Sequence, residues 1–195
     1  MKFSKAAMFG LDARIALAIF GALSVISGAA LYSAIKQART ISYVTELQEL
    51  AKAAEAYILD TGQDLPIAIT RFADSKELVE STVSGWAGPY LSGRTTTHFI
   101  YHDDFYLKFF VVGPDDNTLG GVGDSKFTGC VSGKVCWYWA AFNGVPLELA
   151  NDIDEYIDGA VDHDAGNVRI ITDVTGVIER EYVFVKMFPR LDQSH

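Results

Sequence analysis

The chain has 195 residues, of which 49% are apolar and 21% charged, and this composition excludes wholesale disorder. Its formal net charge of -9 argues against a protein that binds nucleic-acid phosphates through a basic face, and two cysteines exclude a disulfide-dense scaffold. The apolar residues are concentrated near the N-terminus, which argues against a uniform soluble globule.

Residues 15–35 form an apolar run, IALAIFGALSVISGAALYSAI, without a charged side chain. As a helix, about 21 residues rise roughly 31 Å, enough to cross the hydrocarbon core of a bilayer. In water, a helix that is apolar all round needs a large surrounding core, and this chain is too short to provide one. The sequence therefore predicts a membrane-spanning helix. Lys2 and Lys5 favour a cytoplasmic N-terminus, although Lys36 and Arg39 at the other end weaken that signal.

Small residues within this run are spaced four apart, as in the pairs Ala18 with Ala22 and Ser24 with Gly28. Each pair shares one helix face, at which a second helix could approach closely. The alternative is that small residues are simply common in membrane helices.

The helix is expected to continue past Ile35, because no turn signal follows it. Apolar residues recur in steps of three and four over 38–58, which is the spacing of one helical stripe. Gly62 and Pro66 are placed to end the helix. We expect one helix from about residue 11 to about residue 60, near 75 Å long, whose second half is amphipathic.

Residues 61–195 are expected to form a small head domain of short elements. The expected elements are a helix over 75–83 capped by Ser75, a loop over 84–93, two strands around the Asp103-Asp104 turn within 98–112, a strand over 135–142, a helix over 146–158, and strands over 167–172 and 177–187. The predicted fold class is α+β, with a long N-terminal helix packed on a small antiparallel sheet.

Cys130 and Cys136 bracket five residues, a spacing that suits a local disulfide in an oxidising compartment. Such a loop would contribute about 2 to 3 kcal/mol of stability. The alternative is two reduced, partly buried thiols.

Seven acidic residues lie between Glu148 and Asp164. Oxygen ligands of this kind suit calcium, and the candidate set is Asp158, Asp162, Asp164 and Asn167. The alternative is a solvated helix face followed by turn residues whose side chains accept backbone hydrogen bonds.

The histidines His98, His102 and His163 have no recognisable nucleophile motif beside them, so we expect surface or turn residues. Alternation along the strand places Trp137 and Trp139 on one face and Tyr138 on the other. One face is expected to be core. The other is also favoured as core, with a subunit contact or a carbohydrate-binding strip as alternatives.

A short basic leader ending at Gly10, a long apolar helix, an amphipathic extension and a small α+β head together resemble a type IV prepilin or a type II secretion pseudopilin. The segment GWAGPYL over 85–91 is similar to the Trp-Gly-Pro-Tyr loop of such heads. The stretch LANDIDEYIDGAVDHDAGNVRI over 149–170 is similar to the acidic helix, turn and strand entry of many pilin-like proteins.

The resemblance implies that a prepilin peptidase cuts after Gly10, which makes Leu11 the mature first residue and a candidate for N-methylation. Most family members have phenylalanine there and glutamate at the fifth mature position, where this chain has Ile15. In the family that carboxylate is thought to pair with a neighbouring subunit's terminal amine. Asp12 and Arg14 are therefore the candidates for subunit registry in this chain.

The resemblance further implies a non-enzymatic structural subunit that polymerises through residues 15–35 with copies of itself or other pilins. Its expected location is the inner membrane, with a periplasmic C-terminal domain, and the cell surface after assembly. No direct nucleic-acid binding is expected from an acidic head. Two alternatives remain open: a membrane-anchored periplasmic binding domain that stays monomeric, and a periplasmic hydrolase with a pocket joining a histidine to a serine or an acid.

Overall fold

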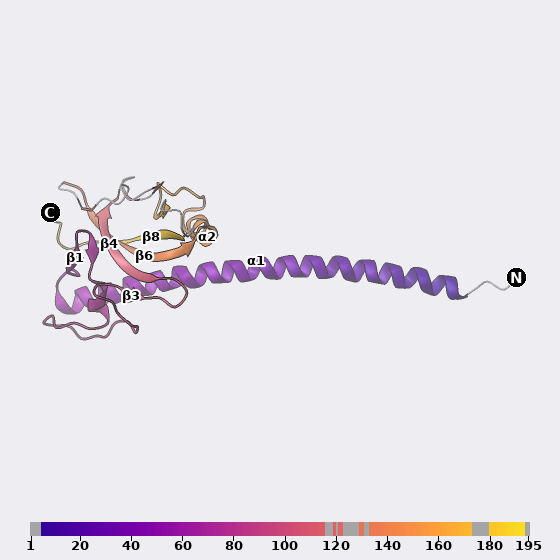
Figure 1. The fold of residues 1–195 in the computed structure, drawn as a ribbon, viewed down its shortest axis with the longest axis horizontal. Helices are drawn as coiled ribbons and strands as arrows, with labels where there is room; N and C mark the ends of the chain where they lie inside the picture. Colours follow the sequence, from indigo (N-terminus) through magenta and orange to yellow (C-terminus); the bar gives the residue numbers. More distant parts are fainter. Residues whose placement is uncertain are drawn as a thin grey trace. The chain divides into compact units, whose positions relative to one another are not determined.

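The computed structural model describes residues 5–115, 119, 121–122, 129–130, 133–172 and 180–193. It contains a long helix α1 (Lys5–Thr61) followed by a sheet and shorter helices (Figure 1). The elements after α1 are β1 (Ile67–Ile69), β2 (Phe72–Ala73), the 3-10 helix η1 (Ser75–Leu78), β3 (Ile100–Tyr101), β4 (Leu107–Pro114), β5 (Gly121–Val122), β6 (Cys136–Pro146), α2 (Leu147–Asp158), β7 (Val168–Thr172) and β8 (Arg180–Pro189). The predicted α+β class is confirmed.

The chain divides into two compact units within α1: unit 1 is Met1–Ile41 and unit 2 is Ser42–His195. The domain boundary predicted at residue 61 follows the end of the helix, whereas the second compact unit already includes the last turns of α1.

Unit 1 is helical from Lys5 onward. The large apolar side chains between Ile15 and Ile35 are 49% to 73% exposed. This part of α1 is long and apolar enough to cross a membrane, and none of its most apolar stretch is buried. Within the described residues, one candidate membrane-spanning helix is therefore present near the N-terminus, as predicted.

In unit 2, the last turns of α1 bury one stripe of side chains. Val44, Leu47, Leu50 and Tyr57 recur at helical spacing and are buried against the sheet. The helix ends where glycine was expected to end it: Gly62 adopts a φ of 68°, and its N–H donates to the Ile58 carbonyl at 2.8 Å.

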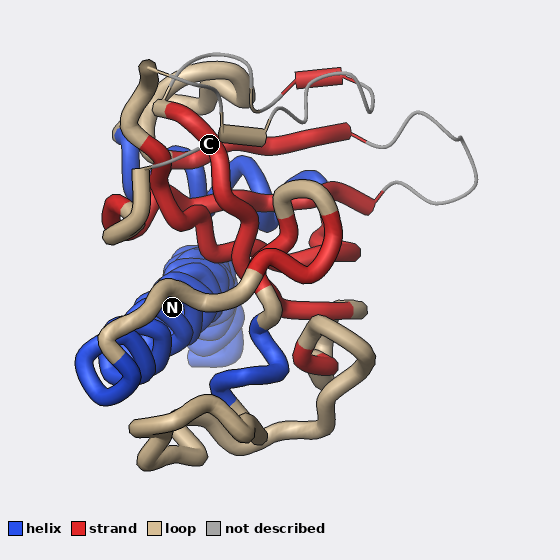
Figure 2. The backbone as a smooth tube through the Cα atoms, turned by 90° about the vertical axis from the view of Figure 1, so that its left-hand side faces the viewer, coloured by secondary structure: helices blue, strands red, loops and turns tan. Residues whose placement is uncertain are grey.

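The sheet has eight strands among the described residues, in the order β1-β2-β4-β6-β8-β7-β5, and β3 pairs with β4 outside this path. Figure 2 shows the strands, in red, beside the blue helices. All pairs are antiparallel except β5 with β7, which are parallel. The prediction of an antiparallel sheet is therefore correct for all but this edge pair.

Both faces of the central strands are covered. One face packs on α1 and α2 through residues such as Phe142 and Val183, and the other face holds Trp139 and Phe184. The predicted alternation is confirmed, because Tyr138 and Trp139 lie in different clusters and are each 0% exposed. Core packing therefore accounts for both residues, and the alternatives of a carbohydrate-binding strip or a subunit contact are wrong for them.

Two predicted helix starts are wrong in detail. The helix over 75–83 is only the short η1, and its cap is Asp74, whose carboxylate accepts the Lys76 N–H at 3.2 Å. Ser75 does not cap, because its buried hydroxyl accepts the Phe110 N–H at 3.0 Å and so ties η1 to β4. Pro146 precedes α2 as its N-cap and does not lie in its first turn.

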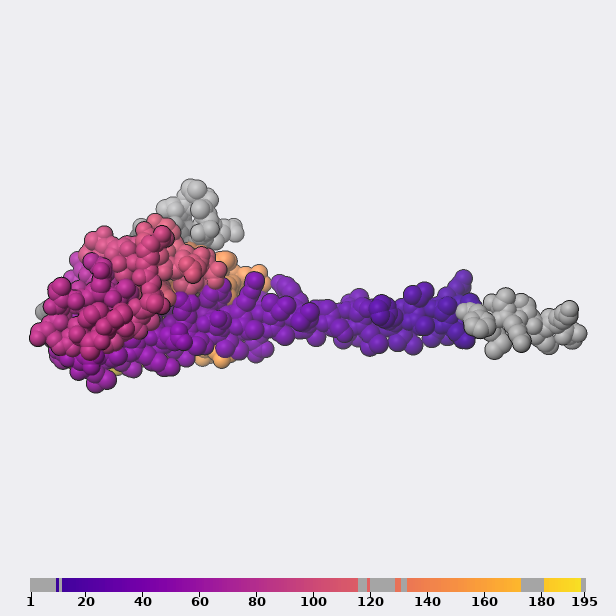
Figure 3. Space-filling model, turned by 90° about the horizontal axis from the view of Figure 1, so that it is seen from below, coloured from indigo at the N-terminus to yellow at the C-terminus, as the bar shows by residue number. Residues whose placement is uncertain are grey.

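The strand predicted over 135–142 continues as β6 to Pro146, and the last strand, β8, continues past its predicted end at Met187 to Pro189. The predicted Thr175-Gly176 connection and residues 177–179 lie outside the described residues. In Figure 3, the magenta and pink segment that follows α1 covers one side of unit 2 beside the purple last turns of that helix.

Candidate functional site

The residues predicted to direct processing lie in unit 1. Gly10 is exposed and helical, and a side chain added there would meet nothing within 4 Å. Asp12 and Arg14 are exposed on the same helix, and Leu11 is helical with its side chain outside the described part of the chain. The processing role of Gly10 and Leu11 and the registry role of Asp12 and Arg14 stay predictions.

Residues 15–35 present a continuous, uncharged apolar surface. Gly21 and Gly28 both face open space, so they leave room for close approach by another helix. A soluble monomer rarely exposes an apolar surface of this length, because water contact with it is unfavourable.

The predicted disulfide is present: Cys130 and Cys136 are bonded, with Cα atoms 5.6 Å apart. Cys136 begins β6, and its N–H donates to Gln193 at 2.7 Å while its carbonyl accepts the Arg190 N–H at 2.9 Å. The cross-link therefore fixes a surface loop beside the point where the C-terminal segment leaves β8.

The GWAGPYL segment ties the end of α1 to η1. The Trp86 indole N–H donates to the Glu77 carbonyl at 2.9 Å, and the Tyr90 hydroxyl donates to Asp60 at 2.8 Å. Gly88 has no room for a side chain, since an added Cβ would lie 2.7 Å from the Trp86 ring. Residues 85–91 therefore connect the end of α1 to η1, and we call this segment the clasp.

The candidate calcium residues are engaged in hydrogen bonds with one another and with the backbone. Asp158 accepts the N–H groups of Asn167 and Val168 at 2.7 and 2.8 Å and the Asn167 side-chain amide at 2.9 Å. Asp162 accepts the Asp164 N–H at 3.1 Å. Over the described ranges, no three acidic, histidine or cysteine side chains converge as metal ligands. These bonds are those of turn residues, and calcium binding stays an untested prediction.

Asp154 was counted only as one acid of the run, but the structure buries it. Its Oδ2 accepts the Asp162 N–H at 2.9 Å, and within the described residues its Oδ1 has no hydrogen-bond partner. Burial raises the pKa of Asp154 to about 6. The signal in the sequence was its position next to Ile153 and four residues after Ala150, on the buried face of α2.

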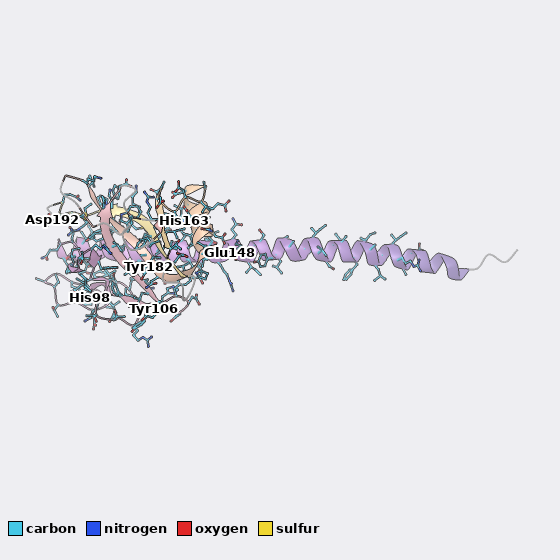
Figure 4. The ribbon with its side chains drawn as sticks, turned by 45° about the horizontal axis from the view of Figure 1, so that its top comes forward. His98, Tyr106, Glu148, His163, Tyr182 and Asp192 are labelled. Carbon is cyan, nitrogen blue, oxygen red and sulfur yellow. A yellow bond between two sulfur atoms is a disulfide. The ribbon has the colours of Figure 1, made fainter. Side chains whose placement is uncertain are left out.

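The three histidines lie in three different places. His98 faces Asp74 at 3.4 Å, and His163 faces the Asn151 side chain at 2.8 Å. In Figure 4, His163 is labelled close to Glu148, a residue of α2, and His98 is labelled apart from both. His102 lies in the turn between β3 and β4, which fits the expectation of surface or turn histidines, and its side chain is only 5% exposed.

A polar groove in unit 2 adjoins His102. It consists of two hollows of about 490 and 540 Å³ that share Glu46, Ser92 and Lys108 in their walls. Arg94 and Tyr101 line the second hollow, where the guanidinium carbon lies 4.3 Å from the ring centre.

Glu46 is the centre of an ion cluster beside this groove. Its Oε1 lies 2.7 Å from the Lys108 ammonium, and its Oε2 lies 3.0 Å from His102 Nε2. The hydrogen bond from His102 and the charge of Lys108 lower the pKa of Glu46 to about 2, although partial burial opposes them. Sequence reasoning missed this cluster because Glu46 lies 56 residues before His102 in the chain.

The groove brings Ser92, His102 and Glu46 together, as the hydrolase alternative required, but His102 is not placed to act as a base toward Ser92. His102 Nδ1 accepts the backbone N–H groups of Asp104 and Phe105 at 3.1 and 3.0 Å, and Nε2 faces Glu46. Since both ring nitrogens are engaged, neither can accept a proton from Ser92.

Comparisons with known protein families, with curated proteins and with solved structures find no match to this chain.

Proposed function

We propose that this chain is a pilin-like structural subunit, made as a single-pass membrane precursor, processed after Gly10 and polymerised through the first half of α1. The observation that carries the proposal is the exposed apolar surface of residues 15–35. Such a surface is stable only in lipid or when bundled with similar helices, because water contact costs free energy in proportion to the apolar area exposed.

Assembly would exchange lipid contacts for contacts between helices. Lipid tails are about as apolar as the side chains of a neighbouring helix, so the hydrophobic effect does little to drive this exchange. The exchange depends instead on close packing and on hydrogen bonds between helices. The small residues Gly21, Ser24 and Gly28 favour such packing. If each copy binds the next by a rotation that does not close, the product is a filament.

The folded head supports a structural role over a catalytic one. Its disulfide, its clasp at residues 85–91 and its ion cluster each join separate parts of the chain. In the groove that holds a histidine, a serine and an acid, both nitrogens of His102 are engaged in hydrogen bonds, so the ring is not placed to take a proton from Ser92.

The test is processing of the full chain co-expressed with a prepilin peptidase. We expect mass spectrometry to find a mature N-terminus at Leu11 and Gly10→Val to retain all ten leader residues. Gly21→Val is the matched control, because Gly21 is also helical and faces open space. Processing of the control at Leu11, together with sedimentable polymer from the unaltered chain, supports the proposal; the control is scored for processing alone, because Gly21 also belongs to the packing surface. A leader that remains intact in the unaltered chain, with no sedimentable polymer, would instead indicate the monomeric membrane-anchored domain.

A further inference from the structure

The position of His102 fixes its protonation state. A backbone N–H can only donate, so Nδ1, which faces the N–H groups of Asp104 and Phe105, must carry a lone pair. The remaining nitrogen, Nε2, therefore carries the proton and donates it to Glu46 at 3.0 Å. This is the neutral tautomer, assigned here from the hydrogen-bond partners.

We propose that His102 is an acid-released latch: its neutral ring holds the 102–105 turn against α1, and a proton on Nδ1 releases that turn. A protonated Nδ1 would point an N–H at two other N–H groups. Both amides would then lose their acceptor and face a third N–H group, which is unfavourable, most of all at the partly buried Phe105 amide. The inference is independent of filament assembly.

The contacts around His102 indicate which residues its protonation would release. The ring of Phe105 stacks on the His102 ring at 4.8 Å between centres, and Tyr43 of α1 donates to the Asp104 carboxylate at 3.0 Å. The Tyr106 N–H donates to the Asn143 carbonyl at 2.8 Å and so remains part of the sheet. The moving part is thus the short turn over 103–105, which also forms one wall of the groove.

Some groups around the His102 ring favour a charged imidazole and others oppose it. The titratable and charged groups that face the ring or line the groove beside it come from four parts of unit 2: Glu46, Glu49 and Tyr43 from α1, Tyr101 from β3, Lys108 from β4, and Arg94, Asp103 and Asp104 from the loops on either side of β3. Glu46 favours a charged ring, but Lys108 offsets that carboxylate at 2.7 Å. Because the pKa of Glu46 is lowered to about 2, Glu46 stays ionised in mild acid and keeps its side of the hydrogen bond with His102.

The experiment uses the full chain in detergent micelles. Long-range ¹H–¹⁵N spectra of the labelled histidines should show His102 as the Nε2–H tautomer near neutral pH. Hydrogen exchange of the Asp104 and Phe105 amides is then followed from about pH 7 to about pH 5, corrected for the intrinsic rate with an unfolded peptide. If opening requires a proton on the ring, protection should fall about tenfold per pH unit below the titration.

Two variants separate the two ring nitrogens. In His102→Asn, the side-chain oxygen lies near the position of Nδ1 and can accept the two amides but does not titrate, so protection should stay constant with pH. In His102→Gln, the amide nitrogen can still donate to Glu46 but no acceptor remains for the turn, so protection should be low at both pH values. Far-UV circular dichroism checks that both variants are folded.

Three results would overturn the proposal. They are an Nδ1–H tautomer in the unaltered chain, corrected protection that does not change between the two pH values, or the same acid-induced loss in His102→Asn as in the unaltered chain. The tautomer and the exchange profile of the unaltered chain decide the matter even if a variant fails to fold.

Discussion

Replacing Asp154 by asparagine should remove a pH-dependent cost from the folded state. The carboxyl group is fully buried, and its pKa is raised from 3.8 to about 6. The folded chain therefore holds this proton to a higher pH than the unfolded chain does. Stability from this group is fully present below about pH 4 and falls as pH rises to about 6. At pH 7, the free energy of unfolding is therefore about 3 kcal/mol lower than it would be if Asp154 kept its proton.

The asparagine side chain in Asp154→Asn would keep the acceptor for the Asp162 N–H but would place an amide NH₂ where Oδ1 has no partner among the described residues. That unsatisfied group costs about 1 to 3 kcal/mol, so the net gain at pH 7 is smaller than that difference in the free energy of unfolding. The decisive quantity is therefore the slope of stability against pH, which should flatten between about pH 4 and pH 6 in Asp154→Asn.

The assay is chemical unfolding of the full chain in detergent, followed by the fluorescence of the tryptophans in unit 2, at several pH values. Glu155→Gln is the matched control, because it removes one exposed acidic charge from the same helix. The control should keep the slope of the unaltered chain. If Asp154→Asn also keeps that slope, the carboxyl group is not charged at a cost in the folded state and the reasoning is refuted.

Two further substitutions test the packing of unit 2. Replacing both Cys130 and Cys136 by serine should lower the free energy of unfolding by about 2 kcal/mol, and a reductant should no longer affect the variant. An unchanged midpoint of denaturant unfolding would show that the contacts of β6 already fix the loop. Leu47→Ala should lower the free energy of unfolding by about 2 to 5 kcal/mol, because Leu47 is 1% exposed in the α1–sheet core. Gln48→Ala, on the exposed side of that helix, should change it little, and equal effects of the two substitutions would contradict the observed helix face.

Local pattern was sufficient to predict most of the elements. The apolar run, the helical stripe over 38–58 and the glycine stop at Gly62 depend on neighbours three or four residues away. The disulfide was also predictable, because only two cysteines exist and they are close in sequence. The β1–β2 hairpin was missed because its strands are too short to establish an alternating pattern.

The ion cluster and the buried acid depend on contacts that the sequence does not display. Glu46 is 56 residues from His102, and their meeting depends on how the sheet packs against α1. Asp154 differs from the other acids of its run only by the helix face it occupies. The role of Ser75 was likewise set by a strand that follows much later in the chain.

Helix α1 contributes to both compact units, so its last turns are as much a part of the head as any strand is. Val44, Leu47, Leu50 and Tyr57 cover a sheet face that would otherwise meet water. A shortened chain meant to be studied without detergent should therefore start no later than Ser42. A chain that starts after Thr61 would lack the α1 side chains that cover this sheet face. Its apolar core would be exposed to water, and we expect such a fragment to aggregate.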